Sequence, residues 1–289
     1  MDWFWFALIS ALFISIETIL EKKILKKEHA LQFSAVVALS IFIISLIFLP
    51  YLNFQQLNTR IFLWIYFNSW LATISFLLVS KSLRHMEISS VTPLLSFGPV
   101  FILIFSLIFL KEKVTNIQIM GIMLVIFGAY VLESKKKNYL APLIEIFRSQ
   151  YIHYIFIALI LNGISTTLDR YFLKNNILDP VSYLFLISIF LAINYSILIT
   201  VLHGGFKEIN KSFKIDGIKI IIIAVLIMIS RIALFQSFSL ASAFLVEPVK
   251  RISVLFVVIF GGVLFHEKHL FKKFIASLLM LGGIYLITT

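Results

Sequence analysis

Residues 110–133 read LKEKVTNIQIMGIMLVIFGAYVLE, and residues 265–288 read FHEKHLFKKFIASLLMLGGIYLIT. At a shift of 155 positions the two stretches carry the same residue at four distinctive places, namely Glu112 and Glu267, Lys113 and Lys268, Gly128 and Gly283, and Tyr130 and Tyr285. Apolar segments often look alike by chance. Shared charged residues and a shared tyrosine under one shift indicate instead an internal repeat.

The composition predicts a membrane protein. Hydrophobic residues make up 61% of the 289 residues and charged residues 13%, against roughly 25% charged residues in soluble domains. A spanning helix needs about 20 mostly apolar residues. Ten segments meet this need, at about 3–24, 31–52, 61–80, 88–110, 115–133, 152–171, 180–202, 217–238, 242–264 and 271–288. They are too long for barrel strands and lack period-two alternation, so the predicted fold class is all-α.

The ten segments divide into two halves of five. Residues 1–133 form the first half, residues 151–289 form the second, and the basic linker 134–150 joins them. Because five is an odd number, the second half enters the membrane from the opposite side. The sequence therefore predicts an inverted five-plus-five repeat, a plan typical of alternating-access transporters that hold their substrate near the midplane.

Lysine and arginine are divided unevenly between the two sides. The connections after odd-numbered segments hold most of them, and the opposite side holds few, such as Arg60, Lys111 and Lys113. Because basic residues gather on the cytoplasmic side, we expect both termini to lie outside. A high content of Ile, Phe and Lys is typical of an AT-rich microbial genome, so we expect a multi-pass protein of a prokaryotic plasma membrane.

Segment 242–264 carries charges near mid-membrane depth. Lys250 and Arg251 lie eight and nine residues in, about 12–14 Å from the start at 1.5 Å per residue. Glu247 precedes them by three and four positions and can reach either side chain. Ionisable residues at the centre of a span cost roughly 2.5–3.5 kcal/mol each, so all three are candidate substrate ligands. A Glu247–Arg251 pair that only neutralises itself is the alternative.

These charges break the symmetry of the repeat. The matching positions of the first half hold Thr92, Leu95 and Ser96. The scaffold does not need charge there, so symmetry-breaking residues are better substrate candidates than the two aligned glutamates, which we interpret as structural helix-end residues. Pro93 and Pro248 do keep the symmetry. Each lacks a backbone donor and predicts a kink.

Three further residues could line a site between the halves. Arg231 is a third buried cation, in the eighth segment; snorkelling or pairing with Glu17 or Glu247 is the alternative. Asn162 could contact a ligand or bond across helices. Trp70 could line a pocket, with packing as the alternative.

The ends of the first and sixth segments carry matched acid–base pairs. At a shift of 148, Glu21-Lys22 aligns with Asp169-Arg170. We predict a gate, or interhelical ion pairs, built from Glu17, Glu21, Lys22, Asp169, Arg170 and Lys174. Glu17 lies deeper and aligns with the neutral Ser165, which makes it a candidate for proton coupling. A plain ion-pair role is the alternative.

Ten helices as five plus five, with the Glu-Lys and Gly-x-Tyr pattern that closes each half, resemble the drug/metabolite transporter superfamily and its EamA-like ten-helix branch. The resemblance is strongest over 88–133 and 243–288. It implies carriage of small metabolites, amino acids, nucleotide sugars or phosphorylated compounds, and no enzyme activity. It also implies cytoplasmic termini in many members, against the charge distribution. The pair Lys250-Arg251 resembles the ninth-helix pair that grips phosphate in the phosphate-translocator branch, although Glu247 departs from that pattern.

We therefore expect a secondary transporter for a small anionic solute, phosphorylated or carboxylated, that acts by alternating access. We expect no cofactor, no metal and no nucleic-acid partner, and a monomer or homodimer surrounded by membrane lipid. The sequence lacks the H-E-x-x-H, P-loop and G-x-S-x-G motifs, which argues against a hydrolase or an ATP-driven pump. A proton-coupled exporter of amino acids or amphipathic compounds and an intramembrane enzyme on lipid-linked substrates are the alternatives.

Overall fold

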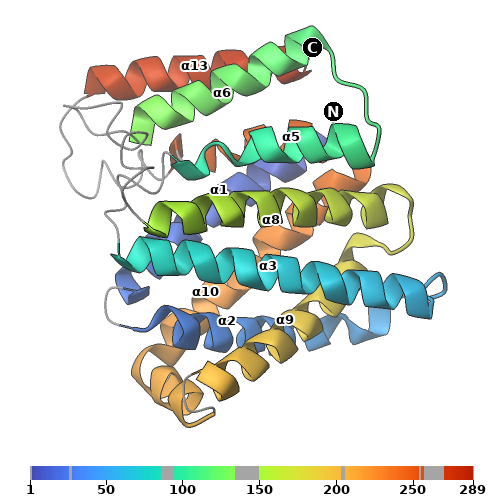
Figure 1. The fold of residues 1–289 in the computed structure, drawn as a ribbon, viewed down its shortest axis with the longest axis vertical. Helices are drawn as coiled ribbons and strands as arrows, with labels where there is room; N and C mark the ends of the chain where they lie inside the picture. Colours follow the sequence, from blue (N-terminus) through green and yellow to red (C-terminus); the bar gives the residue numbers. More distant parts are fainter. Residues whose placement is uncertain are drawn as a thin grey trace.

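The computed structural model of the chain describes residues 2–25, 28–85, 94–133, 150–202, 206–253, 255–256 and 270–288. Every regular element in these ranges is a helix (Figure 1). The first half contributes α1 (Asp2–Leu25), α2 (Ala30–Ser45) with the 3-10 turn η1 (Leu46–Tyr51), α3 (Thr59–His85), α5 (Gly98–Phe109) and α6 (Asn116–Glu133). The second half contributes α8 (Gln150–Lys174), α9 (Pro180–Leu202), α10 (Phe206–Leu240), α11 (Ala243–Lys250) and α13 (Leu270–Thr288).

Six of the helices in the described ranges are long and apolar enough to cross a membrane, and shorter apolar helices accompany them. Without water in the bilayer core, a helix satisfies its backbone groups within its own segment. That is why apolar runs of this length form helices. The predicted all-α polytopic fold is confirmed.

The eighth span begins at the residue that we predicted, since the membrane-spanning part of α10 is Gly217–Leu240. The helix itself starts earlier, at Phe206. The added turns carry Lys and Glu among apolar residues. Lysine and glutamate are good helix formers, so the helix extends past the apolar run.

The fourth and ninth segments are broken, although we predicted each as one continuous helix. Residues 94–95 are helical, residues 96–97 form a turn, and α5 starts at Gly98. In the second half α11 ends at Lys250, and residues 251–252 form a turn. A shift of 155 carries one turn onto the other. Pro248, in the last turn of α11, cannot donate to the preceding turn. Pro93 lies outside the described residues.

The helices pack mainly across the two halves. α1 packs on α10, and α8, which corresponds to α1, packs on α3, which corresponds to α10. The pairs α2–α9, α5–α11 and α6–α13 join equivalent helices. Figure 1 shows α6 and α13 side by side at one end of the molecule. The packing is therefore symmetric between the halves. If the two halves are exchanged, the α1–α10 contact becomes the α8–α3 contact, and the pairs of equivalent helices stay the same.

Glycine allows the α6–α13 pair to approach closely. A Cβ atom added to Gly121 would lie 2.6 Å from the carbonyl oxygen of Gly283, and one added to Gly283 would lie 2.6 Å from that of Gly121. A Cβ on Gly128 would lie 3.0 Å from the carbonyl oxygen of Ala276. Small residues at such crossings are typical of membrane helix pairs.

Candidate functional site

A polar cavity of about 230 Å³ lies among α1, α3, α8, α9, α10 and α11. Sites for drug-sized ligands usually measure about 300–1,000 Å³, so this one suits a small solute. Five charged residues line it, namely Glu17, Asp169, Arg231, Glu247 and Lys250. They come from both halves of the chain. Three carboxylates face two cations, a formal charge of −1 when all are ionised.

Arg231 is the cation of this cavity that has no direct partner. It lies in the membrane-spanning part of α10, where an uncompensated charge is expensive. Among the residues that the structure describes, none forms a hydrogen bond or an ion pair with its guanidinium. Its charge interacts at longer range with those of Glu17 and Asp169. The guanidinium is therefore open to a ligand.

Lys250 already has a partner. Its Nζ donates to Oε1 of Glu247 at 2.5 Å, one turn earlier on α11. The Glu247 side chain is 2% exposed, so this pair is largely withdrawn from water. The observed partner of Glu247 is thus Lys250, and not Arg251 as in the alternative considered from the sequence.

Arg251 points away from this group. It does not appear in the cavity lining. A Cβ atom added to Gly98 would lie 2.8 Å from the Nη2 atom of Arg251. The guanidinium therefore sits against the first turn of α5. Its Nε is buried without a hydrogen-bond partner in the described part of the chain. Gly98 is the residue that leaves room for it.

Asp169 belongs to a hydrogen-bond network in the cavity wall. Its Oδ1 accepts from Nδ2 of Asn68 at 2.7 Å and from the Tyr183 hydroxyl at 2.5 Å. Nδ2 of Asn68 also donates to the Tyr183 oxygen at 3.0 Å. Asn68 and Tyr183 are fully buried. The network ties α3, α8 and α9 together beside the cavity.

Arg170 and Lys174 form a separate cluster with Glu112. Arg170 Nε lies 3.2 Å and Lys174 Nζ 3.5 Å from Oε1 of Glu112, and Arg170 Nη1 donates to the carbonyl oxygen of Phe238. The cluster joins the loop after α5 to α8 and α10. None of its three charged residues lines the cavity. The cluster therefore joins helix ends outside the lining of this cavity.

The remaining predicted residues divide between the cavity and other places. Asn162 lines the cavity, whereas Trp70 and Glu21 do not. Lys22 lies on α1, but its side chain falls outside the described residues. Tyr183 was missed, since a tyrosine in an apolar run resembles the other aromatic residues there. What distinguishes Tyr183 is its hydrogen bond to the Asp169 carboxylate on another helix, and only the fold brings these two residues together.

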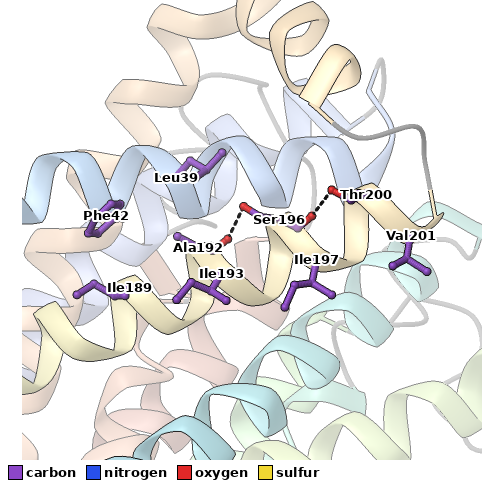
Figure 2. A pocket seen from close by; sticks show the side chains of 9 residues that line it. All are labelled: Leu39, Phe42, Ile189, Ala192, Ile193, Ser196, Ile197, Thr200 and Val201. Carbon is purple, nitrogen blue, oxygen red and sulfur yellow. Dashed lines mark hydrogen bonds between the residues drawn. The ribbon is translucent and has the colours of Figure 1, made fainter.

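A second hollow, about 640 Å³ in volume, lies between α2 and α9 (Figure 2). Its lining residues are apolar except for Ser196 and Thr200. Figure 2 shows those two hydroxyls bonded to carbonyl oxygens one turn earlier, on Ala192 and Ser196. No charged residue lines this groove, whereas five line the cavity, so we take the cavity as the candidate site.

The EamA-like transporter family matches the chain in two parts, residues 1–134 and 150–289. The chain belongs to this family. The two parts fall on the two halves, and the transporter carries its charged cavity between them. The uncharacterized protein MJ1333.1 of Methanocaldococcus jannaschii is 31% identical over 125 residues, which cover 43% of this transporter and 91% of that protein. A crystal structure at 10% identity superposes with a TM-score of 0.74 over 99% of this chain and 95% of that one, a likeness of fold.

Proposed function

We propose that this EamA-like transporter is a secondary carrier for a small solute that bears a carboxylate or another anionic group, bound by Arg231. The observation that carries the proposal is the guanidinium of Arg231, which lines the cavity without a direct partner among the described residues. Arginine presents donors in a planar fork that matches a carboxylate or phosphate. A bound anion would supply the direct hydrogen-bond partner that no described residue gives to this guanidinium.

The charges around Arg231 favour a solute with little net negative charge. Glu247 neutralises Lys250, and Arg251 lies outside the cavity lining. Glu17 and Asp169 add negative charge to the same space. A multiply charged phosphate would meet one free cation and two carboxylates. A single carboxylate is the better match, with Lys250 close by to assist.

The arrangement of helices supports alternating access. Equivalent helices from the two halves pack on one another, and the fourth and ninth helices break at matching turns. Broken helices around a midplane site are typical of transporters built from inverted repeats. We propose that movement of one half against the other exposes the cavity to each side in turn. An ion gradient or exchange of solutes would drive it, and lipid chains would fill the groove between α2 and α9.

Binding to purified protein in lipid nanodiscs tests the proposal. The probes are alanine, phenylalanine, aspartate, lactate, phenyllactate, malate, inorganic phosphate and putrescine. We expect carboxylates to raise the melting temperature of the wild type, because a ligand at 100 times its Kd stabilises by about 2.7 kcal/mol. Arg231→Gln should abolish these shifts. Arg251→Gln, a buried cation beside the site, is the matched control and should keep them.

Two outcomes would contradict the anionic-group proposal. One is a set of carboxylate shifts that survives Arg231→Gln. The other is a shift with putrescine alone, which would assign the cavity to cations and leave Arg231 a structural role. Uptake into proteoliposomes should follow the same order of variants as binding.

Glu17 supports a second candidate, proton-coupled export. Its carboxylate lines the cavity without a hydrogen bond or ion pair to any described residue, so it is free to exchange a proton with the cavity. Glu17→Gln should then remove the response of solute flux to a pH gradient and leave solute exchange intact. An unaltered response in this variant would exclude Glu17 as the coupling residue.

A further inference from the structure

The hydrogen atoms of the Asn68–Asp169–Tyr183 network have determined positions. A carboxylate only accepts hydrogen bonds, so Asp169 Oδ1 must receive one from Asn68 Nδ2 and one from the Tyr183 hydroxyl. The single hydroxyl hydrogen of Tyr183 is then used. Its oxygen therefore accepts from Nδ2 of Asn68, at 3.0 Å. Because this oxygen and Asp169 Oδ1 are only 2.5 Å apart, they lie in nearly the same direction from Nδ2 and share one amide hydrogen. The nitrogen of the Asn68 amide, and not its oxygen, must therefore face these two atoms, because an oxygen there would meet the carboxylate oxygen with no hydrogen between them. This fixes the orientation of the amide.

This orientation leaves one acceptor over. Oδ1 of Asn68 is buried and has no hydrogen-bond partner among the described residues, although Asn68 lines the cavity. A buried acceptor without a partner has lost its hydrogen bonds to water and gained none in return, which is unfavourable. Asp169 has a second oxygen, Oδ2, to which no described residue donates. Two acceptors with no donor of their own therefore lie on the same wall.

We propose that Asn68 Oδ1 and the Asp169 carboxylate form a second subsite of this cavity, which binds an ammonium group of the solute through its N–H donors. The inference rests on the proposed role of Arg231 and extends it. The solute is then a zwitterion, with its anionic group at Arg231 and its ammonium group at Asn68 and Asp169. Tyr183 is a positioning residue, because it holds Asp169 and orients the Asn68 amide.

Charge balance points the same way. The cavity lining carries three carboxylates and two cations. A solute with only a carboxylate would satisfy Arg231 and leave Asp169 and Glu17 without a counter-charge. A zwitterion has no net charge and supplies a cation for these acids, which matters because charges within a membrane need a partner.

The second acceptor predicts selectivity for hydrogen-bond donors as well as for charge. An ammonium with N–H groups can donate to Asn68 Oδ1, whereas a trimethylated nitrogen cannot. A site built to hydrogen-bond one group discriminates strongly against an analogue that lacks it, because its buried polar atoms are left without partners. The subsite is therefore expected to distinguish an amine from a hydroxyl and from a quaternary ammonium.

The test compares matched solutes on the full chain in nanodiscs. Alanine, phenylalanine and aspartate are paired with lactate, phenyllactate and malate, which replace the ammonium by a hydroxyl, and glycine is paired with glycine betaine. We expect at least one primary amine to bind ten-fold or more tightly than its partner, which corresponds to about 1.4 kcal/mol. Asn68→Leu should bring that ratio close to one. The ratio is measured within one variant, so a general loss of folded protein does not imitate the result.

Asn194→Leu is the matched control. Asn194 is also fully buried and also has an Oδ1 without a described partner, but it donates to Ser69 and Thr73 and does not line the cavity. It should keep the wild-type ratio. Tyr183→Phe removes the hydroxyl that orients the amide and should lower the ratio without abolishing carboxylate binding.

The outcomes separate the two proposals. Equal affinity for the amine and hydroxyl partners, with both lost in Arg231→Gln, would overturn the ammonium subsite and leave the anionic-group proposal standing. A ratio that persists in Asn68→Leu would also overturn the subsite. Binding of none of the carboxylates would overturn both proposals.

Discussion

Replacing Glu112 by glutamine is expected to destabilise the transporter markedly. The Glu112 side chain is 3% exposed and that of Arg170 is 7% exposed, with 3.2 Å between Oε1 and Nε. Removing one partner of a buried ion pair costs about 3–5 kcal/mol, because the other charge stays buried without compensation. The amide oxygen can still accept from Nε, and Arg170 keeps its bond to the Phe238 carbonyl. We therefore expect the lower end, about 3 kcal/mol.

The measurement is the melting temperature in nanodiscs, followed by tryptophan fluorescence. At about 2 °C per kcal/mol, the lower end of the range for chains of roughly this length, Glu112→Gln should lower it by roughly 6 °C. Lys174→Gln is the matched control, since Lys174 contacts the same oxygen at 3.5 Å but is 43% exposed. Exposed pairs contribute about 0–1 kcal/mol, so the control should shift the melting temperature by about 2 °C or less.

A double variant tests whether the effect belongs to the pair. The double variant Glu112→Leu with Arg170→Leu removes both charges. We expect it to be more stable than the single variant Glu112→Leu, in which Arg170 stays buried without its partner. Equal small shifts for Glu112→Gln and Lys174→Gln would refute the reasoning. They would mean that Glu112 is hydrated and that the cluster is an ordinary surface interaction.

Three further substitutions have expected outcomes, the first two measured as melting temperatures and the third by chemical modification. Gly283→Ala should cost about 1–3 kcal/mol by overpacking, since its Cβ would lie 2.6 Å from the Gly121 carbonyl oxygen, while Gly282→Ala, where the nearest atom is 3.5 Å away, should be neutral. Asn194→Leu should lower the stability by about 0.6–2 kcal/mol, the value of interhelical hydrogen bonds in membranes. Ser196→Ala should lower it less, because the Ser196 hydroxyl bonds only within its own helix. Gly98→Ala should displace Arg251, whose Nη2 would lie 2.8 Å from the new Cβ; unchanged accessibility of that side chain to a guanidine-modifying reagent would contradict this.

Much of the fold followed from the sequence, because the signals that carry it are local. Apolar runs of about 20 residues predict spanning helices wherever they occur, and the identities at a shift of 155 revealed the repeat without any knowledge of packing. The broken helices were less predictable. Pro248 indicated a bend, but the break in the first half was missed, although Pro99 stands in the first turn of α5, directly after the turn at residues 96–97, where proline is favoured.

The candidate site was predicted as a set of buried charges, and the structure sorted that set. Glu17, Asp169, Arg231, Glu247, Lys250 and Asn162 line one cavity, whereas Arg170 and Arg251 do not. The sequence could not tell that Lys250 and Asp169 line the cavity while Arg251 and Arg170 do not. Each pair consists of neighbours in the chain, which have the same depth in the membrane.

The sequence by itself determined the helices, the repeat and the presence of buried charge, because each of these depends on residues close together or on alignment along the chain. Only the tertiary structure decided which charges share a cavity. An α-helix turns by about 100° per residue, so consecutive side chains leave the helix toward different neighbours. Those neighbours, α5 for Arg251 and the cavity for Lys250, come from helices far away in the sequence.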